Sequence, residues 1–431
     1  MIDQISIVQL FGRFDYTIEL KNRPMTILTG PNGYGKSTIL SIIEAVNSCN
    51  LFYFDSLPFK EIKFTFDDGN CLFVEKRSDK AKTQLFVNDV LVAPEIRKIR
   101  VPWGIVRHYY PNKSGDVFYS RHTVDGIDAY YFLWNEDTPQ EMFDEIVKYN
   151  GLSETSIAEL NNVTGILKAA KKSCGSTRKI SEQRLVRKKF FWSDEENGII
   201  DVITELPTKM KAKISEVTTQ YSLKANSLDS TYPRRLLNTK EGLAGTEEFN
   251  ERLEVTNCKF EKLSRYELAE FKWLSDIAYN DEFSKALKVY FDDCDEKYKI
   301  FEPFINKLDA FIDIVNKRLA FKKIVVDKEC GITVEDDSAA NRNLKLSQLS
   351  SGEKQEIILF YELIFESDKN LLLLIDEPEI SLHIAWQRKF MDDLEKVVNL
   401  SEIQVIVATH SPQLINNRWD IQIDLGELSG R

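Results

Sequence analysis

The sequence lacks any apolar run long enough to cross a membrane. A transmembrane helix needs about 18 or more consecutive apolar residues, and no stretch of the 431 residues approaches that length. The N-terminal segment MIDQISIVQLFGRF has no basic start, no apolar core and no small-residue cleavage site, so it does not resemble a signal peptide. We therefore expect a cytoplasmic protein that makes no contact with a membrane.

Cysteines are few and dispersed. The six cysteines form no C-x-x-C pair, which argues against a zinc site or a disulfide framework and suits a reducing compartment. Heptads sustained over many turns, internal repeats and low-complexity tracts are also missing, so a long coiled coil is not expected. The hydrophobic share of 43% and charged share of 29% are those of an ordinary globular protein. The length favours one large domain that carries a second, inserted one.

The net charge of −11 argues against a surface devoted to nucleic acid, because neutralising phosphates requires clustered Lys and Arg. One basic tract exists between residues 168 and 189, where a single acid, Glu182, accompanies nine basic residues. A solvated helical face or linker is one interpretation, and a site for DNA or an acidic partner is the other. The nine are Lys168, Lys171, Lys172, Arg178, Lys179, Arg184, Arg187, Lys188 and Lys189.

Changes in periodicity divide the chain into three parts. Residues 2–29 and 61–110 alternate as strands do, with a helix predicted from Lys36 to Val46. Between about residues 140 and 320 the period becomes helical, and strand patterns return after that. The predicted domains are an N-terminal part at 1–140, an inserted α-helical domain at 141–320, and a C-terminal part at 321–431.

A glycine-rich motif follows the buried strand MTILT and precedes a helix. This strand, loop and helix are the context that a phosphate-binding P-loop requires. Glycines let successive backbone N–H groups face phosphate oxygens, and the helix adds its positive N-terminal end. We expect Lys36 to neutralise the β- and γ-phosphates of ATP and the Ser37 hydroxyl to bind Mg²⁺. The nucleotide-binding candidates here are Asn32, Gly33, Gly35, Lys36, Ser37 and Thr38.

Two adjacent carboxylates end the apolar segment LLLLIDEP. Neighbouring residues of a strand point to opposite sides, so Asp376 and Glu377 are expected to do different work. Asp376 is the candidate metal ligand. Glu377 is the candidate general base that orients and deprotonates the attacking water.

Two more segments complete the pattern. The turn LSSGE, with Ser350 and Gly352, starts a helix and offers a second anion site through its backbone donors. His410 follows the strand QVIVA in the segment ATHS, where a γ-phosphate sensor would stand. Taken alone, the turn would be interpreted as a helix cap and the histidine as a structural residue. The order of all four motifs along the chain favours the anion site and the phosphate sensor instead.

The order P-loop, LSSGE, LLLLIDEP and ATHSP resembles ABC-type ATPase heads of the SMC and RecF kind, over about the first and last 110 residues. The resemblance implies an α/β fold with a P-loop core sheet, an antiparallel β-lobe and an inserted α-helical domain, and a Mg²⁺-dependent ATPase. It also implies a homo-oligomer, at least a head-to-tail dimer, in which Ser350 and Gly352 contact the ATP bound by the partner copy. His410 would be the switch histidine.

A narrower resemblance rests on LFGRFDYTIEL, LDSTYPRRLL and IDEPEISLHIAWQ. These segments are similar to standalone ATPases of bacterial antiphage defence, such as those of the PARIS and Septu systems, and Arg13 would match a head residue near the nucleotide. Two features depart from the family pattern. Neither Gln84 nor Gln140 stands where the Q-loop glutamine is expected, and the turn Ser381-Leu382-His383 lacks the aspartate of transporter D-loops.

Several functions remain open at this point. The first is a sensor or scaffold that controls a separate effector, a nuclease or toxin, in response to DNA or a phage protein. The second is an SMC- or RecF-like ATPase that closes around DNA for repair. A transporter ATPase is disfavoured by the large helical insert, and a nuclease domain in the same chain is not expected because only 21 residues follow His410.

Overall fold

The computed structural model describes most of the chain. The described residues are 2–20, 23–47, 53–77, 82–88, 90–93, 120–124, 127–131, 176–180, 185–190, 197–268, 278–336, 343–367, 371–382, 384–401 and 403–428, with isolated positions between 141 and 151. Among these residues no helix combines the length and apolar character needed to span a bilayer.

The chain forms two compact units. Unit 1 contains residues 1–200 and 367–431, and unit 2 contains residues 201–366. These units are divided by contacts, whereas the predicted domains 1–140, 141–320 and 321–431 are divided by motif and periodicity. The units differ from those domains in two places. Strands after residue 175, in the predicted helical domain, pair within unit 1. The strands and helix from 322 to 365, in the predicted C-terminal part, pack with the long helices of unit 2. The three predicted domains stay a prediction.

Unit 1 is built around a five-stranded parallel sheet. Its strand order is β10-β16-β17-β3-β18, so segments from three distant parts of the chain lie side by side. The three central strands are buried along their whole length, as in a parallel sheet covered on both faces. The strands are β10 (Ser176–Ile180), β16 (Leu371–Asp376), β17 (Gln404–Ala408), β3 (Met25–Thr29) and β18 (Gln422–Asp424).

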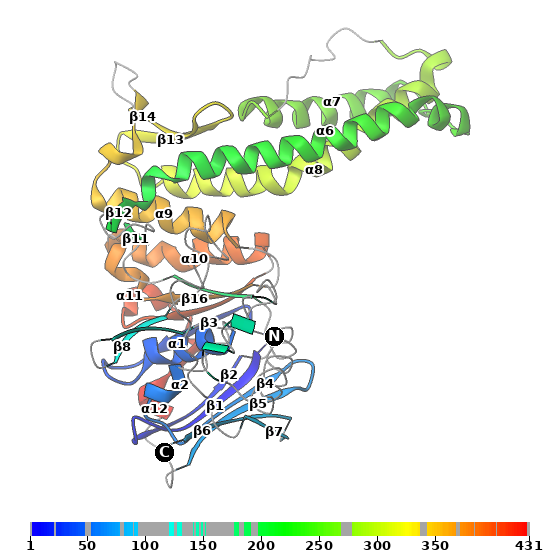
Figure 1. Ribbon diagram of the computed structural model, residues 1–431. Coiled ribbons are helices and arrows are strands. Elements are labelled where there is room, and N and C mark those ends of the chain that lie inside the picture. Colours follow the sequence, from blue (N-terminus) through cyan, green and yellow to red (C-terminus); the bar gives the residue numbers. More distant parts are fainter. Residues whose placement is uncertain are drawn as a thin grey trace. The chain divides into compact units, whose positions relative to one another are not determined.

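An antiparallel sheet of order β2-β1-β4-β5-β6-β7 forms the second layer of unit 1. Helix α1 (Lys36–Asn47) shares one apolar core with both sheets, in which Ile7 and Phe64 of the antiparallel sheet join Leu374 of the parallel sheet. In Figure 1, α1 and α10 lie on opposite sides of the parallel sheet. The six strands are β1 (Ile2–Leu10), β2 (Phe14–Glu19), β4 (Glu61–Phe66), β5 (Cys71–Arg77), β6 (Lys82–Val87) and β7 (Val90–Ala93).

Short elements complete unit 1. Helix α10 (Ile384–Ser401) buries Phe390, Met391 and Leu394. Strands β8 and β9 form a small antiparallel pair, and β11 pairs with β12 in another two-stranded sheet. The remaining elements are α2 (Tyr53–Ser56), β8 (Ser120–Val124), β9 (Ile127–Tyr131), β11 (Val186–Phe190), β12 (Asn197–Asp201), η4 (Pro378–Ser381), α11 (Pro412–Ile415), η5 (Trp419–Ile421) and α12 (Leu425–Leu428).

Unit 2 consists of three long helices, a three-stranded sheet and a shorter helix. Helices α6 (Leu206–Asn238) and α8 (Ser284–Asn316) have 33 residues each, and both α6 and α7 (Thr246–Arg265) pack on α8. Figure 1 shows α6, α7 and α8 running side by side. The other elements are η1 (Val202–Thr204), η2 (Asp281–Phe283), β13 (Lys322–Asp327), β14 (Gly331–Asp336), β15 (Asn343–Leu344), η3 (Leu346–Gln348) and α9 (Ser351–Phe365).

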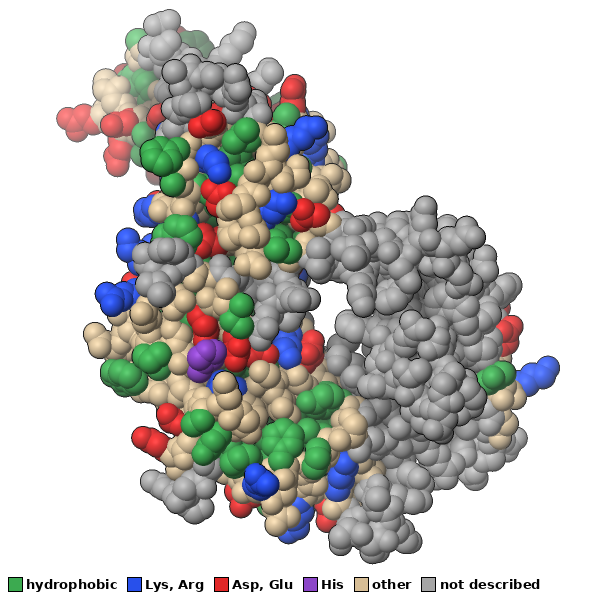
Figure 2. All heavy atoms as spheres, turned by 90° about the vertical axis from the view of Figure 1, so that its left-hand side faces the viewer, with side chains coloured by type: hydrophobic (Ala, Val, Ile, Leu, Met, Phe, Trp, Pro, Cys, Tyr) green, Lys and Arg blue, Asp and Glu red, His purple; other side chains and the backbone are tan. Residues whose placement is uncertain are grey.

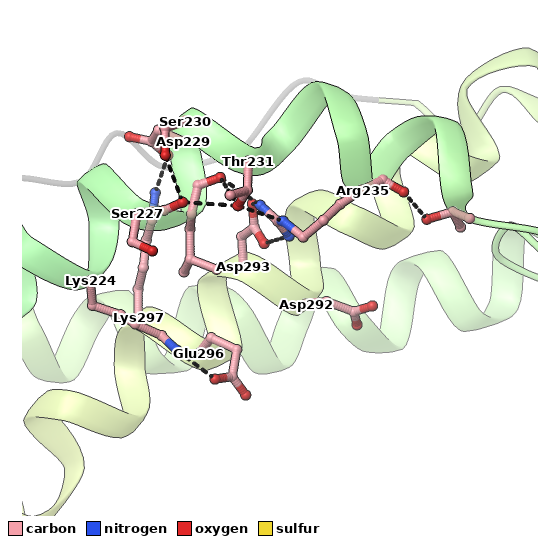
Figure 3. Close-up of polar contacts among 12 residues, drawn as sticks. Lys224, Ser227, Asp229, Ser230, Thr231, Arg235, Asp292, Asp293, Glu296 and Lys297 are labelled. Atoms are coloured by element: carbon pink, nitrogen blue, oxygen red, sulfur yellow. Dashed lines mark hydrogen bonds and ion pairs between the residues drawn. The ribbon is translucent and has the colours of Figure 1, made fainter.

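The segment LDSTYPRRLL lies in α6 and makes a polar cluster with α8 (Figure 3). Arg235 forms a two-point ion pair with Asp293 and also donates to the Leu228 carbonyl at 2.7 Å. Pro233 has no N–H to continue the helix ladder, so side chains that bond nearby carbonyls support the helix here. The segment therefore joins α6 to α8.

The predicted α/β fold, with a P-loop core sheet, a β-lobe and a helical insert, is confirmed. The expected strands before residue 30, the helix after the P-loop and the antiparallel strands from residue 61 are present. The helical expectation for 141–320 holds for α6 to α8 and is wrong for Ser176–Ile180, Val186–Phe190 and Asn197–Asp201, which form β10, β11 and β12. The solvated-helix interpretation of the basic tract is wrong there, because pairing of β10 with the buried β16 outweighs local propensity.

Candidate nucleotide-binding site

The P-loop joins β3 to α1 at the carboxyl edge of the parallel sheet. Gly33 and Gly35 have φ values of 89° and 87°, a region that side chains disfavour. A Cβ added at Gly33 would meet no atom within 4 Å, so the space beside it is open. Lys36 is only 6% exposed, and its ammonium donates to the carbonyls of Gly30 and Pro31 at 2.8 and 3.4 Å. Loop and lysine thus form a polar cradle, with Asn32 and Thr38 beside them in sequence.

The predicted metal ligands come together from opposite ends of the chain. The Ser37 hydroxyl donates to Asp376 Oδ1 at 2.9 Å, and the two residues are 339 positions apart. Magnesium is commonly held by one or two carboxylates, substrate phosphates and water rather than by a cage of protein groups. The described residues contain no group of three His, Cys, Asp or Glu side chains that could hold a metal. A hydroxyl and one carboxylate beside a phosphate cradle fit Mg²⁺ delivered with a nucleotide.

Glu377 stands at a strained turn directly after β16. Its φ of 43° and ψ of 58° place it in the left-handed region, and its N–H donates to the Ala408 carbonyl at 2.9 Å. Its side chain Oε1 lies 3.5 Å from His410 Nδ1. Strain of this kind persists where the surrounding structure enforces it, as at many active sites. The turn therefore brings the predicted base and the predicted sensor together.

Glu379 is a further carboxylate of this site that sequence reasoning missed. Its Oε1 accepts the Thr409 hydroxyl at 2.6 Å and the His410 N–H at 3.1 Å, and it lies 3.5 Å from His410 Nδ1. The residue is 8% exposed. A third acid two residues after Asp376-Glu377 was the available signal, but its partner Thr409 follows 30 residues later in the sequence.

Lys179 of β10 belongs to the basic tract, for which the sequence leaves a solvated face or linker and a site for DNA or an acidic partner open, and its ammonium lies beside Asp376. Its ammonium donates to Ser41 Oγ of α1 at 2.8 Å and is 3.9 Å from Asp376 Oδ2, with 14% of the side chain exposed. Burial raises the pKa of the nearby Glu44 carboxyl, and the Lys179 charge opposes that rise. The metal-ligand candidate Asp376 thus has a half-buried cation beside it.

The turn that carries Arg13 borders the P-loop. A Cβ at Gly35 would come within 3.0 Å of Leu10 Cδ2 and 3.4 Å of a Phe11 ring carbon, so β1 and its turn pack against the loop. The Phe14 ring lies 5.1 Å from that of Tyr34 in the loop. Arg13 is exposed on this turn, and its N–H donates to the Leu10 carbonyl. The turn is thus held beside the phosphate cradle.

The turn LSSGE lies in unit 2 at the start of α9. Ser350 is the N-cap and forms a capping box with Glu353, whose carboxylate accepts from the Ser350 N–H and hydroxyl, both at 2.9 Å. Burial works against ionisation of Glu353, yet bonds from Lys322 and Ser350 hold the pKa of this carboxyl below its usual value. A Cβ at Gly352 would meet no atom within 4 Å. Contacts among the described residues therefore do not require glycine here, and the surface is open to an approaching molecule.

Other predicted positions stay unplaced. Gln84 lies in β6, opposite Glu75 of β5, and Gln140 and His383 are outside the described residues. In the basic tract, Lys171 and Lys172 lie outside them as well, and Lys188 and Lys189 belong to β11 with side chains that are not described. Figure 2 shows a histidine with acidic and basic side chains near it on the described part of one face.

Comparisons with known proteins found one family model and several similar solved structures. A family model described as an AAA ATPase domain matches residues 1–415. No curated protein matches the chain. Similar solved structures include an Smc head domain from Pyrococcus furiosus with an extended coiled coil, bound to the C-terminal domain of ScpA, at 14% identity and a TM-score of 0.40, covering 96% of this chain and 91% of that one. An SMC head domain from Thermotoga maritima is 12% identical with a TM-score of 0.33, covering 96% and 90%.

Proposed function

This chain belongs to the AAA ATPase domain family, and we propose that it binds ATP with Mg²⁺ and hydrolyses it as an ABC-type ATPase. The observation that carries the proposal is the 2.9 Å hydrogen bond between Ser37 of the P-loop and Asp376 at the end of β16. It joins the phosphate cradle to the acidic strand end, which is the pairing that a magnesium nucleotide requires.

Each residue has a role in this proposal. The P-loop N–H groups and Lys36 bind the phosphates, while Ser37 and Asp376 hold Mg²⁺, which supplies positive charge to the phosphate oxygens. Glu377 takes a proton from the water, and His410, within 3.5 Å of it, senses the terminal phosphate.

We also propose that the active form is at least a head-to-tail dimer. The resemblance to SMC-type heads supports this, and so does the open space beside Gly352. In such a dimer Ser350 and Gly352 of one copy complete the ATP site of the other. A mixture of Lys36→Ala and Ser350→Arg protomers should then be more active than either alone, because one of its two sites carries both lesions and the other carries neither.

Nucleotide binding and turnover test the core of the proposal. Lys36→Ala should lose ATP binding, whereas Glu377→Gln should keep it and lose hydrolysis by roughly 10²-fold or more, since an amide cannot accept the proton. Lys63→Ala and Glu19→Gln, on exposed strand positions, are matched controls that should behave as the wild type. Normal phosphate release by Glu377→Gln would refute the assignment of the base.

For the biological role we propose a sensor or scaffold that controls a separate effector, a nuclease or toxin. The resemblance of LDSTYPRRLL to antiphage defence ATPases supports this role, and the long helices α6 and α8 offer a surface large enough for a partner. When the tagged protein is expressed together with the neighbouring gene, the product of that gene should co-purify with it in one nucleotide state. If nothing co-purifies, and Lys36→Ala leaves phage protection unchanged while DNA binding follows ATP, the DNA-clamp alternative replaces this one.

A further inference from the structure

The first turn of α9 is tied by two ion pairs that the proposed reaction does not use. Lys322 Nζ lies 2.9 and 3.1 Å from the two carboxylate oxygens of Glu353, the residue that also holds Ser350. Next to it, Lys354 Nζ lies 3.1 Å from Asp201 Oδ2. Consecutive residues of the same turn are therefore each held by an opposite charge from another segment.

The two ion-pair partners, Asp201 and Lys322, lie near the two ends of one structure, where the chain enters and leaves the three long helices. Asp201 ends β12 and leads through η1 into α6, and Lys322 opens β13 shortly after α8 ends. We call α6 to α8, residues 206–316, the helical arm. The chain enters the arm directly after Asp201 and leaves it shortly before Lys322, so any shift of the arm acts on both ion pairs.

Burial explains why these pairs matter to the turn. From Ile357 to Phe365 every residue of α9 is buried, so apolar packing holds the body of the helix. The first turn is different, because Ser350, Ser351 and Gly352 are exposed and contribute no apolar packing. Orientation of the turn then depends on the polar tethers, which are partly shielded from water, with side-chain exposures of 26% and 17% for Lys322 and Glu353.

We propose that Lys322 and Asp201 are positioning residues through which the helical arm sets the placement of Ser350. This inference rests on the proposed function, in which Ser350 serves the ATP of a partner copy. Binding of an effector or DNA to the arm would change the Lys322–Glu353 and Asp201–Lys354 contacts and so the fit of the turn to that ATP. Two arrangements that differ by a few kcal/mol are sufficient for such coupling.

The first experiment compares Lys322→Met with Lys323→Met. Lys323 is the next residue of β13 and is exposed, so it controls for loss of a lysine from that strand. Lys322→Met should lower kcat about tenfold, since bonds to a charged group are lost, while ATP binding to the isolated protomer and the melting temperature stay near wild type. Lys322→Arg should recover most of the activity. Equal effects of the two Met variants, or loss of ATP binding, would overturn the proposal.

The second experiment uses mixed protomers. Lys322→Met mixed with Lys36→Ala should regain activity above either parent, because one composite site then has an intact P-loop and an intact turn. Asp201→Asn mixed with Lys36→Ala should behave the same way. The Ser350→Arg and Lys36→Ala mixture calibrates the assay: rescue there without rescue for Lys322→Met refutes this inference alone, and no rescue in any mixture refutes the dimeric site itself.

Discussion

The P-loop edge of unit 1 and the LSSGE turn of unit 2 are held in different ways. At the edge, Lys36, Asp376 and Glu379 are each less than 9% exposed and rest on buried strands. The turn is exposed and depends on ion pairs at the surface. Buried groups such as those at the edge would need little reorganisation in the reaction that we propose. The turn is better suited to adjustment, so the two regions should respond differently to substitution, pH and metal.

The largest effect that would sharpen this contrast is expected at Glu379. Glu379→Ala removes the acceptor shared by Thr409 and the His410 N–H, and should lower kcat about 10- to 100-fold with little change in ATP binding, as loss of a supporting contact does. Thr409→Val should cost less, and the double variant little more than Glu379→Ala alone. Additive losses in steady-state assays would show that the two residues act separately.

An intermediate effect concerns Glu356, which lies in α9 just beyond the turn and is 2% exposed. Burial raises the pKa of this carboxyl to about 8, with Arg318 pulling it down. The folded protein therefore binds a proton that the unfolded chain has lost, and stability should fall as pH rises from about 4.5 to about 8, by up to roughly 1.4 kcal/mol per pH unit.

Glu356→Gln tests this by removing the titration while keeping the shape. Its melting temperature should exceed that of the wild type at about pH 8 and depend less on pH between about 5 and 8. Gln355→Glu, at a half-buried neighbouring position, controls for charge on the helix. A wild-type profile that stays parallel to that of Glu356→Gln would contradict the assignment.

The smallest effect is expected at Lys179. Its ammonium, 3.9 Å from Asp376 Oδ2, competes with a cation at that carboxylate. Lys179→Met should therefore lower the Mg²⁺ concentration for half-maximal ATPase activity about two- to fivefold, since charges this close repel even with strong screening. Arg178→Met, one residue earlier in β10, is the control. A higher Mg²⁺ requirement would show instead that Lys179 orients Asp376.

Local sequence patterns predicted the candidate residues at the P-loop edge of unit 1. A glycine-rich loop between an apolar strand and a helix is typical of a phosphate-binding site, and two acids after LLLLI indicate the end of a buried strand. The elements β3, α1 and β16 could therefore be predicted, with Gly33, Lys36, Ser37 and Asp376 as candidates. Periodicity likewise indicated the long helices α6 and α8. These features follow from interactions between residues close in the chain, and for that reason a single sequence reveals them.

Tertiary structure alone decided the rest. Ser176–Ile180 is mostly polar and basic, and it becomes the edge strand β10 of the parallel sheet by pairing with β16, which brings Lys179 to within 3.9 Å of Asp376 Oδ2. The Thr409 hydroxyl donates to Glu379 and the Lys322 ammonium donates to Glu353, and each pair is separated by about 30 residues in the sequence. Such pairs produce no periodic pattern in the sequence. Their interaction energy depends on the distance between the groups and on their burial, and both are fixed only when the sheets and helices have packed.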